Sequence, residues 1–155
     1  MSITSFETVL HEHPFFRDMP EERVEVLAGC AANVVFQPDE FIFRADQKAE
    51  RFYVIRFGRV ALESWLPQGG SIPIETVEAG DVLGWSWLFP PYKWHFDARA
   101  QTLVRALALD GVCLREKCER DPGLGFELVR RFAQVAVRRL EATQLQLLDL
   151  YVNRP

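Results

Sequence analysis

Two kinds of hydrophobic pattern follow one another along the chain. Residues 6–13 and 19–30 place apolar side chains at helical spacing, and Pro14 and Pro20 predict where one short helix ends and the next begins. Residues 33–110 instead carry short runs of β-branched and aromatic residues, separated by turn residues at regular intervals. Such runs predict an antiparallel sandwich or barrel. After Gly111 the spacing is helical again.

The strands expected in the middle of the chain share alternating or continuous apolar positions. They cover residues 33–36, 40–43, 52–57, 59–66, 71–78, 96–102 and 105–110. Glycine and aspartate mark the turns between them, which is the chemistry that tight turns require.

The last helix is the longest element that the pattern predicts. Asp121 and Pro122 form an N-cap followed by proline at the first helical position, and the helix should run from about residue 123 to about residue 152. At 1.5 Å per residue it is roughly 45 Å long, too long to lie entirely against a domain of this size. Its apolar positions recur at threes and fours, the spacing of a helix–helix seam. They are Phe126, Val129, Ala133, Ala136, Leu140, Leu147 and Leu150. We therefore expect a homodimer through this helix.

Composition narrows the class of protein. A chain of 155 residues with 48% hydrophobic and 26% charged residues suits one soluble globular domain. Its net charge of −4 argues against sequence-independent binding to nucleic acid. No apolar run reaches the ~18 residues of a membrane span, and the N-terminus lacks the pattern of a signal peptide. We expect a cytoplasmic protein with no membrane role.

Candidate chemistry is sparse. The three cysteines, Cys30, Cys113 and Cys118, have no paired spacing, which predicts buried or half-buried thiols on helices and no disulfide framework. A cupin-type metal site needs closely spaced histidines on a strand. The His-x-His pair of this chain, His11 and His13, precedes the strands. We therefore expect no metal, no cofactor and no catalysis.

The order of elements resembles a known family. The segments that carry the resemblance are HPFFRDMPEERVEVLA (13–28), FQPDEFIFRADQKAERFYVIRFGRVAL (36–62), VEAGDVLGW (77–85) and RALALDGVCLREKCERDPGLGFELVRRFA (105–133). Together they are similar to the cyclic nucleotide-binding domain of catabolite activator protein and its relatives, the Crp/Fnr-like sensory domains.

The resemblance implies a mainly β fold with flanking helices. It implies one domain over residues 1–155, with N-terminal helices in 1–32, an eight-stranded antiparallel jelly roll in 33–110 and C-terminal helices in 111–155. Gly58 is the expected hairpin glycine with positive φ. Asp39 and Asp46 stand where the family often has glycine, and aspartate tolerates tight turns.

The ligand-binding cassette of that family is altered in this chain. Relatives that bind cyclic nucleotides follow the second glycine of Gly-Asp-x-x-Gly with a glutamate, which accepts a hydrogen bond from the ribose. They later place an arginine, followed by a small hydroxyl residue, against the cyclic phosphate. Here Trp85 follows Gly84, and Trp94 and His95 occupy the arginine window. A ring cannot replace the charge-assisted pair that arginine makes with phosphate.

The resemblance thus implies a degenerate cassette, and its candidate residues come from one stretch of the chain. They are Gly84, Trp85, Ser86, Trp87, Lys93, Trp94, His95 and Arg99. Asp97, in the same stretch, is expected to join a satisfied polar network or to pair with Lys93 or Arg99. We expect that cAMP is not bound in the usual way.

Three functions remain open. The first is a non-catalytic regulatory module whose rings fill the cassette and which acts through an unknown protein partner. No helix-turn-helix is expected, because the chain stops at Pro155. The second is a sensor of a different small anionic or aromatic ligand in an aromatic-lined pocket, and the third is a cupin-like enzyme. A large hollow lined by Trp85, Trp94 and Arg99 would favour the sensor, and rings that fill the hollow would favour the module.

Overall fold

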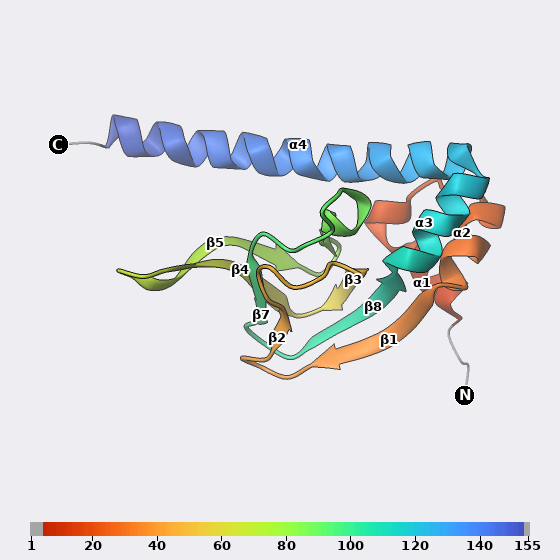
Figure 1. Ribbon diagram of the computed structural model, residues 1–155, viewed down its shortest axis with the longest axis horizontal. Helices are drawn as coiled ribbons and strands as arrows, with labels where there is room; N and C mark the ends of the chain where they lie inside the picture. The colour runs from red at the N-terminus through yellow and green to blue at the C-terminus, as the bar shows by residue number, and fades with distance from the viewer. Residues whose placement is uncertain (1–4, 154–155) are drawn as a thin grey trace. The chain divides into compact units, whose positions relative to one another are not determined.

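The strands form two four-stranded sheets in which every neighbouring pair is antiparallel (Figure 1). The first sheet has the order β1-β8-β3-β6 and the second the order β2-β7-β4-β5. The strands are β1 (Ala31–Phe36), β2 (Phe41–Phe43), β3 (Arg51–Phe57), β4 (Arg59–Leu66), β5 (Gly70–Glu78), β6 (Val82–Leu83), β7 (Asp97–Ala100) and β8 (Val104–Asp110). The structure is a computed structural model that describes residues 5–153. The expected mainly β fold is confirmed, and β6 is a strand that the pattern did not predict.

Two compact units make up the chain, residues 1–117 and residues 118–155. The first unit contains both sheets, the helices α1 (Phe6–Glu12) and α2 (Glu21–Ala28), and the 3-10 turns η1 (Pro14–Phe16) and η2 (Ser86–Leu88). Helix α3 (Gly111–Arg120) crosses the boundary, and the second unit contains α4 (Pro122–Val152). The outer ends of the expected segments 1–32 and 111–155 lie outside the described residues.

The core of the first unit is built by the most apolar strands. Phe52 and Ile55 of β3 and Leu107 and Leu109 of β8 are fully buried. Strand β8 pairs with β1 on one side and with β3 on the other, so its backbone groups are hydrogen-bonded at both edges. Burial of apolar surface at about 25 cal/mol per Å² is the main source of stability for such a sandwich.

Turn residues behave as their chemistry predicts. Gly58, between β3 and β4, has φ of 95°, and a Cβ atom there would clash with the backbone oxygen of Leu103. Only glycine fits that position. Asp39 and Asp46 also have positive φ, each 70°, which confirms the relaxed turns expected from the sequence.

The cysteines depart from expectation. Cys30 and Cys113 form a disulfide across a sequence separation of 83 residues, and Cys118 is the free cysteine. Cys30 lies in the turn after α2 rather than on a helix, and Cys113 lies in the first turn of α3. The expectation of no disulfide was wrong because sequence spacing cannot reveal that β1 and β8 pair, and this pairing brings residues 30 and 113 together.

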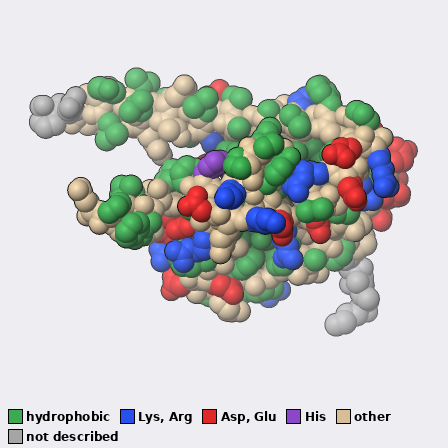
Figure 2. All heavy atoms as spheres, viewed as in Figure 1, with side chains coloured by type: hydrophobic (Ala, Val, Ile, Leu, Met, Phe, Trp, Pro, Cys, Tyr) green, Lys and Arg blue, Asp and Glu red, His purple; other side chains and the backbone are tan. Residues whose placement is uncertain are grey.

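Helix α4 begins where its cap predicts. The Asp121 side chain accepts a hydrogen bond from the backbone N–H of Leu124, and Pro122 occupies the first helical position. Figure 2 shows hydrophobic side chains along this helix. Within residues 5–153, no helix combines the length and the apolar character needed to cross a membrane.

Candidate functional site: the loop from Gly84 to Trp94

The loop between β6 and β7 carries most of the candidate residues. It contains η2 and then a tight turn in which the Tyr92 N–H donates to the Phe89 carbonyl at 2.8 Å. The Pro90–Pro91 peptide bond inside this turn is cis, as in turns with cis-proline at the third position. The loop ends with Trp94, whose N–H donates to the Gln47 carbonyl at 3.0 Å. Its backbone is therefore tied to the segment that follows β2.

Trp94 occupies the space in front of Gly84. Its ring stacks on Phe43 of β2, with centroids 3.8 Å apart and planes 9° apart, and the residue is only 5% exposed. A Cβ atom on Gly84 would lie 2.5 Å from Cη2 of Trp94, and Gly84 has φ of 95°. Position 84 therefore requires glycine in this chain, because only a residue without a side chain lets the Trp94 indole lie so close to the backbone.

Trp87 faces a different part of the same unit. It is fully buried and stacks on Phe52 of β3, with ring centroids 5.2 Å apart. Its Cβ lies so close to Gly111 that a Cβ atom on that glycine would be 3.0 Å away. Two of the three tryptophans in the stretch are therefore core residues, and each has a separate aromatic partner.

One arginine of helix α3, Arg115, contacts the loop at two points. Arg115 donates to the carbonyl oxygen of Trp87, and its guanidinium lies 4.3 Å from the centre of the Tyr92 ring. A guanidinium over an aromatic face within about 6 Å is a cation–π contact. Arg115 thus contacts the loop on both sides of Pro90–Pro91, at Trp87 in η2 and at Tyr92.

The remaining candidate residues of the loop do not form a common binding site. Lys93 and His95 are exposed, Gly84 and Trp85 are half-buried, and Ser86 is buried. Lys93 lies opposite Lys48 in an isolated antiparallel bridge, so two cations face the same side there. The structure brings Gly84 and Trp94 into contact and leaves the two basic side chains of the loop in solvent.

Arg99 belongs to the other face of its sheet. It pairs with Ala61, whereas its neighbour Ala98 pairs with Leu62 and Phe43. Because successive side chains on a strand point to opposite faces, Arg99 lies on the face away from Phe43. Its position in the cassette is therefore not supported by the strand register.

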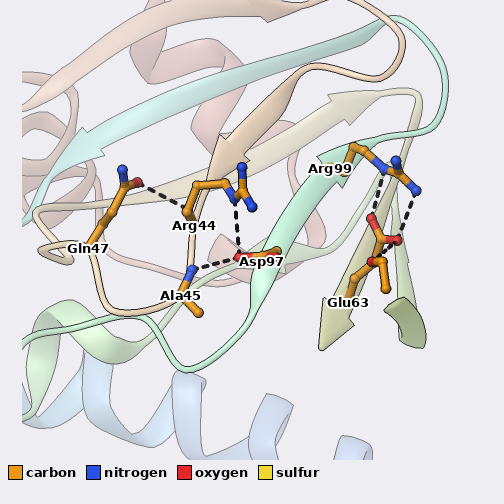
Figure 3. Close-up of polar contacts among 7 residues, drawn as sticks. Arg44, Ala45, Gln47, Glu63, Asp97 and Arg99 are labelled. Carbon is orange, nitrogen blue, oxygen red and sulfur yellow. Dashed lines mark hydrogen bonds and ion pairs between the residues drawn. The ribbon is translucent and has the colours of Figure 1, made fainter. Parts of the chain in front are cut away.

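A buried carboxylate holds the Arg99 side chain in place (Figure 3). The Arg99 guanidinium contacts both carboxylate oxygens of Glu63, with Nε at 2.8 Å from Oε1 and Nη2 at 2.9 Å from Oε2. Ser71 also donates to Glu63 Oε2 at 2.7 Å. The Glu63 side chain is 3% exposed and that of Arg99 is 39% exposed. This two-point pair is structural, because a buried carboxylate left alone would be costly.

Asp97 joins a polar network, which is the first of the two roles expected from the sequence. Its Oδ1 accepts a hydrogen bond from the Ala45 N–H at 2.8 Å and lies 3.5 Å from Nε of Arg44 (Figure 3). The alternative pairing with Lys93 or Arg99 was wrong, because the segment directly after β2 supplies both partners. Arg44 also lies over the ring of Phe41, 3.9 Å from its centre.

His13, considered from the sequence only as half of a His-x-His pair, is buried. Its Nε2 lies 3.1 Å from the Ile55 carbonyl, and its Nδ1 accepts from the Phe15 N–H at 3.2 Å. Desolvation lowers the pKa of His13 below 6.5, and the hydrogen bond to Ile55 opposes that shift. The ring is therefore neutral with its proton on Nε2, and it joins η1 to β3.

A hollow of about 530 Å³ lies elsewhere in the first unit, among α1, α2 and β1. Its lining residues are Ser5, Phe6, Glu7, Glu25, Ala28, Gly29 and Asn33. The cassette residues are not among them. Within residues 5–153, no three histidine, cysteine, aspartate or glutamate side chains are grouped so that they could hold a metal ion.

Comparison with known proteins agrees with this architecture. The family model described as the cyclic nucleotide-binding domain matches residues 33–121, which is more than half of the chain. The chain belongs to the cyclic nucleotide-binding domain family. A CRP-like cAMP-activated global transcriptional regulator from Mycobacterium tuberculosis is 29% identical over 132 residues. That match covers 82% of this chain and 57% of the regulator, so the chain spans little more than half of its length.

Solved structures of this family have a similar fold. A protein from Geobacter metallireducens, named for cyclic nucleotide binding, has 27% identity and a TM-score of 0.79, with 89% of this chain and 99% of that chain covered. The catabolite activator protein of Thermus thermophilus has 21% identity and a TM-score of 0.69, with coverages of 89% and 63%. The latter likeness concerns the fold alone.

Four partners of the candidate residues escaped sequence reasoning. Phe43, Phe52, Glu63 and Arg115 lie far along the chain from the side chains they contact. The one available signal was a glutamate inside the apolar run of β4. A lone acid in such a run predicts a buried ion pair, although it does not identify the partner.

Proposed function

We propose that this chain is a non-catalytic regulatory module of the cyclic nucleotide-binding domain family that fills its own cassette and acts through a protein partner. The observation that carries the proposal is the indole of Trp94, packed between Phe43 and the backbone of Gly84. A ligand phosphate that approached the Gly84 backbone would have to displace this ring. A tryptophan buries about 150–250 Å², so the displacement would expose a large apolar surface.

The charges required by a cyclic nucleotide are also missing from this position. Arg99 is engaged by Glu63 on the opposite face of its sheet, and Lys93 is exposed. Loss of a buried charge-pair partner typically costs about 2–5 kcal/mol of binding free energy. These contacts favour self-filling over a sensor with a different small ligand, and we infer no enzymatic role.

Homodimerisation through α4 is the second part of the proposal. Five residues of the expected seam are exposed large hydrophobic side chains in the single chain. They are Phe126, Val129, Leu140, Leu147 and Leu150. An apolar seam of this length is more stable when a second helix covers it, and a two-fold axis would make the contact self-complementary. The proposal also includes a jelly-roll topology and a cytoplasmic location. The net charge of −4 favours a protein over DNA as the partner of this module.

Calorimetry with cAMP and cGMP tests the filled cassette. We expect dissociation constants of about 1 mM or weaker, because the ring and the missing charge pair together remove most of the usual binding energy. A Trp94→Ala variant, measured beside the native chain, opens the space in front of Gly84 and reports how much of the block comes from the ring. A low-micromolar constant for cAMP with the native chain would refute self-filling.

A further inference from the structure

The Cys30–Cys113 disulfide has an unusual place in the first unit. The segment that it closes, residues 31–112, contains all eight strands of both sheets. One end of the bond lies directly before β1, and the other lies in the first turn of α3, directly after β8. Asp110 caps this turn by accepting hydrogen bonds from the N–H groups of Val112 and Cys113. The bond therefore fixes the position at which α3 leaves the sandwich.

Helix α3 touches the candidate site on its other side. Gly111 and Arg115 are four residues apart and so share one side of the helix, whereas Cys113 points away from that side. The N–H of Gly111 donates to the Glu50 carbonyl at 2.7 Å, and Gly111 lies against Trp87. Arg115 holds the Trp87 carbonyl and the Tyr92 ring. The start of α3 thus lies between the disulfide and the loop of residues 86–92.

The two bonded cysteine residues differ in exposure. Cys30 is 8% exposed, whereas Cys113 is half-buried. An external thiolate therefore reaches the Cys113 sulfur more readily. This step rests on the cytoplasmic location proposed above, because cytosolic disulfides, where they occur, are usually transient or redox-sensing rather than permanent. Burial and, secondarily, the charge of Asp121 raise the pKa of the thiol of the remaining cysteine, Cys118, which disfavours its thiolate form.

We propose that the Cys30–Cys113 bond is a reversible redox clamp on α3, opened by a dithiol reductant, and that its opening loosens the hold of α3 on residues 86–92. One thiolate of the dithiol attacks the Cys113 sulfur, forms a mixed disulfide and releases the Cys30 thiolate, which takes up a proton. The second thiol of the reductant then attacks the reductant sulfur that is bonded to Cys113. This step closes a disulfide within the reductant and releases Cys113 as a thiolate, which takes up a proton. The protein gains two electrons and two protons, and the dithiol becomes a disulfide.

The test uses the full chain with Cys118→Ala, so that only the two clamp cysteines remain. Alkylation under denaturing conditions should find no free thiol after oxidation with a small disulfide and two after treatment with dithiothreitol. Native-state hydrogen exchange is then compared between the two forms. We expect amides in residues 86–92 to exchange at least about tenfold faster after reduction, equivalent to about 1.4 kcal/mol less opening free energy.

Two comparisons separate the clamp from a general loss of stability. Amides of β4 that pair with β5 should change much less than those of the loop, because both strands belong to the second sheet, whereas β1 and β8, which flank the disulfide, belong to the first. In an Arg115→Gln variant, the loop should exchange rapidly in both redox states, so reduction should add little. Two free thiols after oxidation would overturn the proposal, and so would loop exchange that is unchanged when the bond opens. If a variant fails to fold, the native chain serves for both tests, with one free thiol expected after oxidation and three after reduction, because it retains Cys118.

Discussion

The loop from Gly84 to Trp94 and the helix α4 are both rich in large apolar side chains, but their side chains differ in exposure. Trp87 and Trp94 in the loop are 0% and 5% exposed, whereas Leu140 and Leu150 on α4 are 57% and 70% exposed. The loop rings have aromatic partners in β2 and β3 of their own unit. The seam of α4 remains open to a partner.

This difference shows that a hydrophobic cluster has no function by itself. Its role depends on whether other residues of the same chain bury its side chains. Exposed apolar surface that recurs at seam spacing indicates an association site, whereas rings stacked on core residues indicate packing. The following experiments test each side of this comparison, from the largest expected effect to the smallest.

A charge in the α4 seam should have the largest effect. Leu140→Glu would place two carboxylates face to face in a desolvated contact, and we expect the dimer dissociation constant to rise by roughly a thousandfold or more. Light scattering coupled to size exclusion measures the mass. The matched control is Gln134→Glu, which adds the same charge at an exposed position of α4 outside the seam. A native mass of 17.9 kDa at tens of micromolar would refute the dimer, and a dimer that survives Leu140→Glu would place the interface elsewhere.

Removal of the Trp94 ring should cost stability in the first unit. We expect Trp94→Ala to lower the free energy of unfolding by about 3–5 kcal/mol, because it leaves a large cavity beside Phe43. Phe89→Ala is the control in the same loop. Phe89 is 52% exposed, so its loss should change stability by only about 0.5 kcal/mol. Trp85 is half-buried, so Trp85→Ala should lower the free energy of unfolding by an amount between those of the other two variants. Urea unfolding measures all three variants, and equal effects for Trp94 and Phe89 would contradict the buried stack.

Gly84→Ala probes the same contact from the backbone side. The added methyl group would clash with Trp94 and would also be held at positive φ, and we expect a cost of about 3 kcal/mol. In a Trp94→Ala background the clash disappears, so the cost should fall to about 1–2 kcal/mol of backbone strain. Additive effects in this double-mutant cycle would show that the ring does not lie against Gly84.

His13 gives the smallest expected effect. Its pKa in the folded state lies below 6.5, so the stability it contributes is present above pH 6.5 and is lost as pH falls through the folded pKa. The slope contributed by one such group approaches about 1.4 kcal/mol per pH unit. His13→Gln keeps a donor for the Ile55 carbonyl and removes the titration. The difference in unfolding free energy between the two proteins should therefore shrink or reverse below pH 6, and a constant difference would contradict a buried neutral His13.

Local features of this protein could be predicted from the sequence alone. Gly58, Asp39 and Asp46 occupy turns with positive φ, and Asp121 and Pro122 begin the last helix. These features depend on the conformational preferences of a residue and its near neighbours. The short β-branched runs likewise predicted every strand except the two-residue β6, because a longer strand is recognised from its own residues. The family resemblance located the loop of Gly84, although not what its rings contact.

Long-range contacts were decided by the tertiary structure. The sequence could not show that Trp94 would pack on Gly84 while Trp87 packed on Phe52, because a one-residue change in strand register moves a side chain to the other face. The same dependence on register explains why Arg99 pairs with Glu63 and why Asp97 pairs with Arg44. The disulfide between Cys30 and Cys113 is the longest-range case, since its two residues are 83 positions apart and meet through the pairing of β1 with β8. Pairings of this kind depend on the register of whole strands, and no short stretch of sequence contains that information.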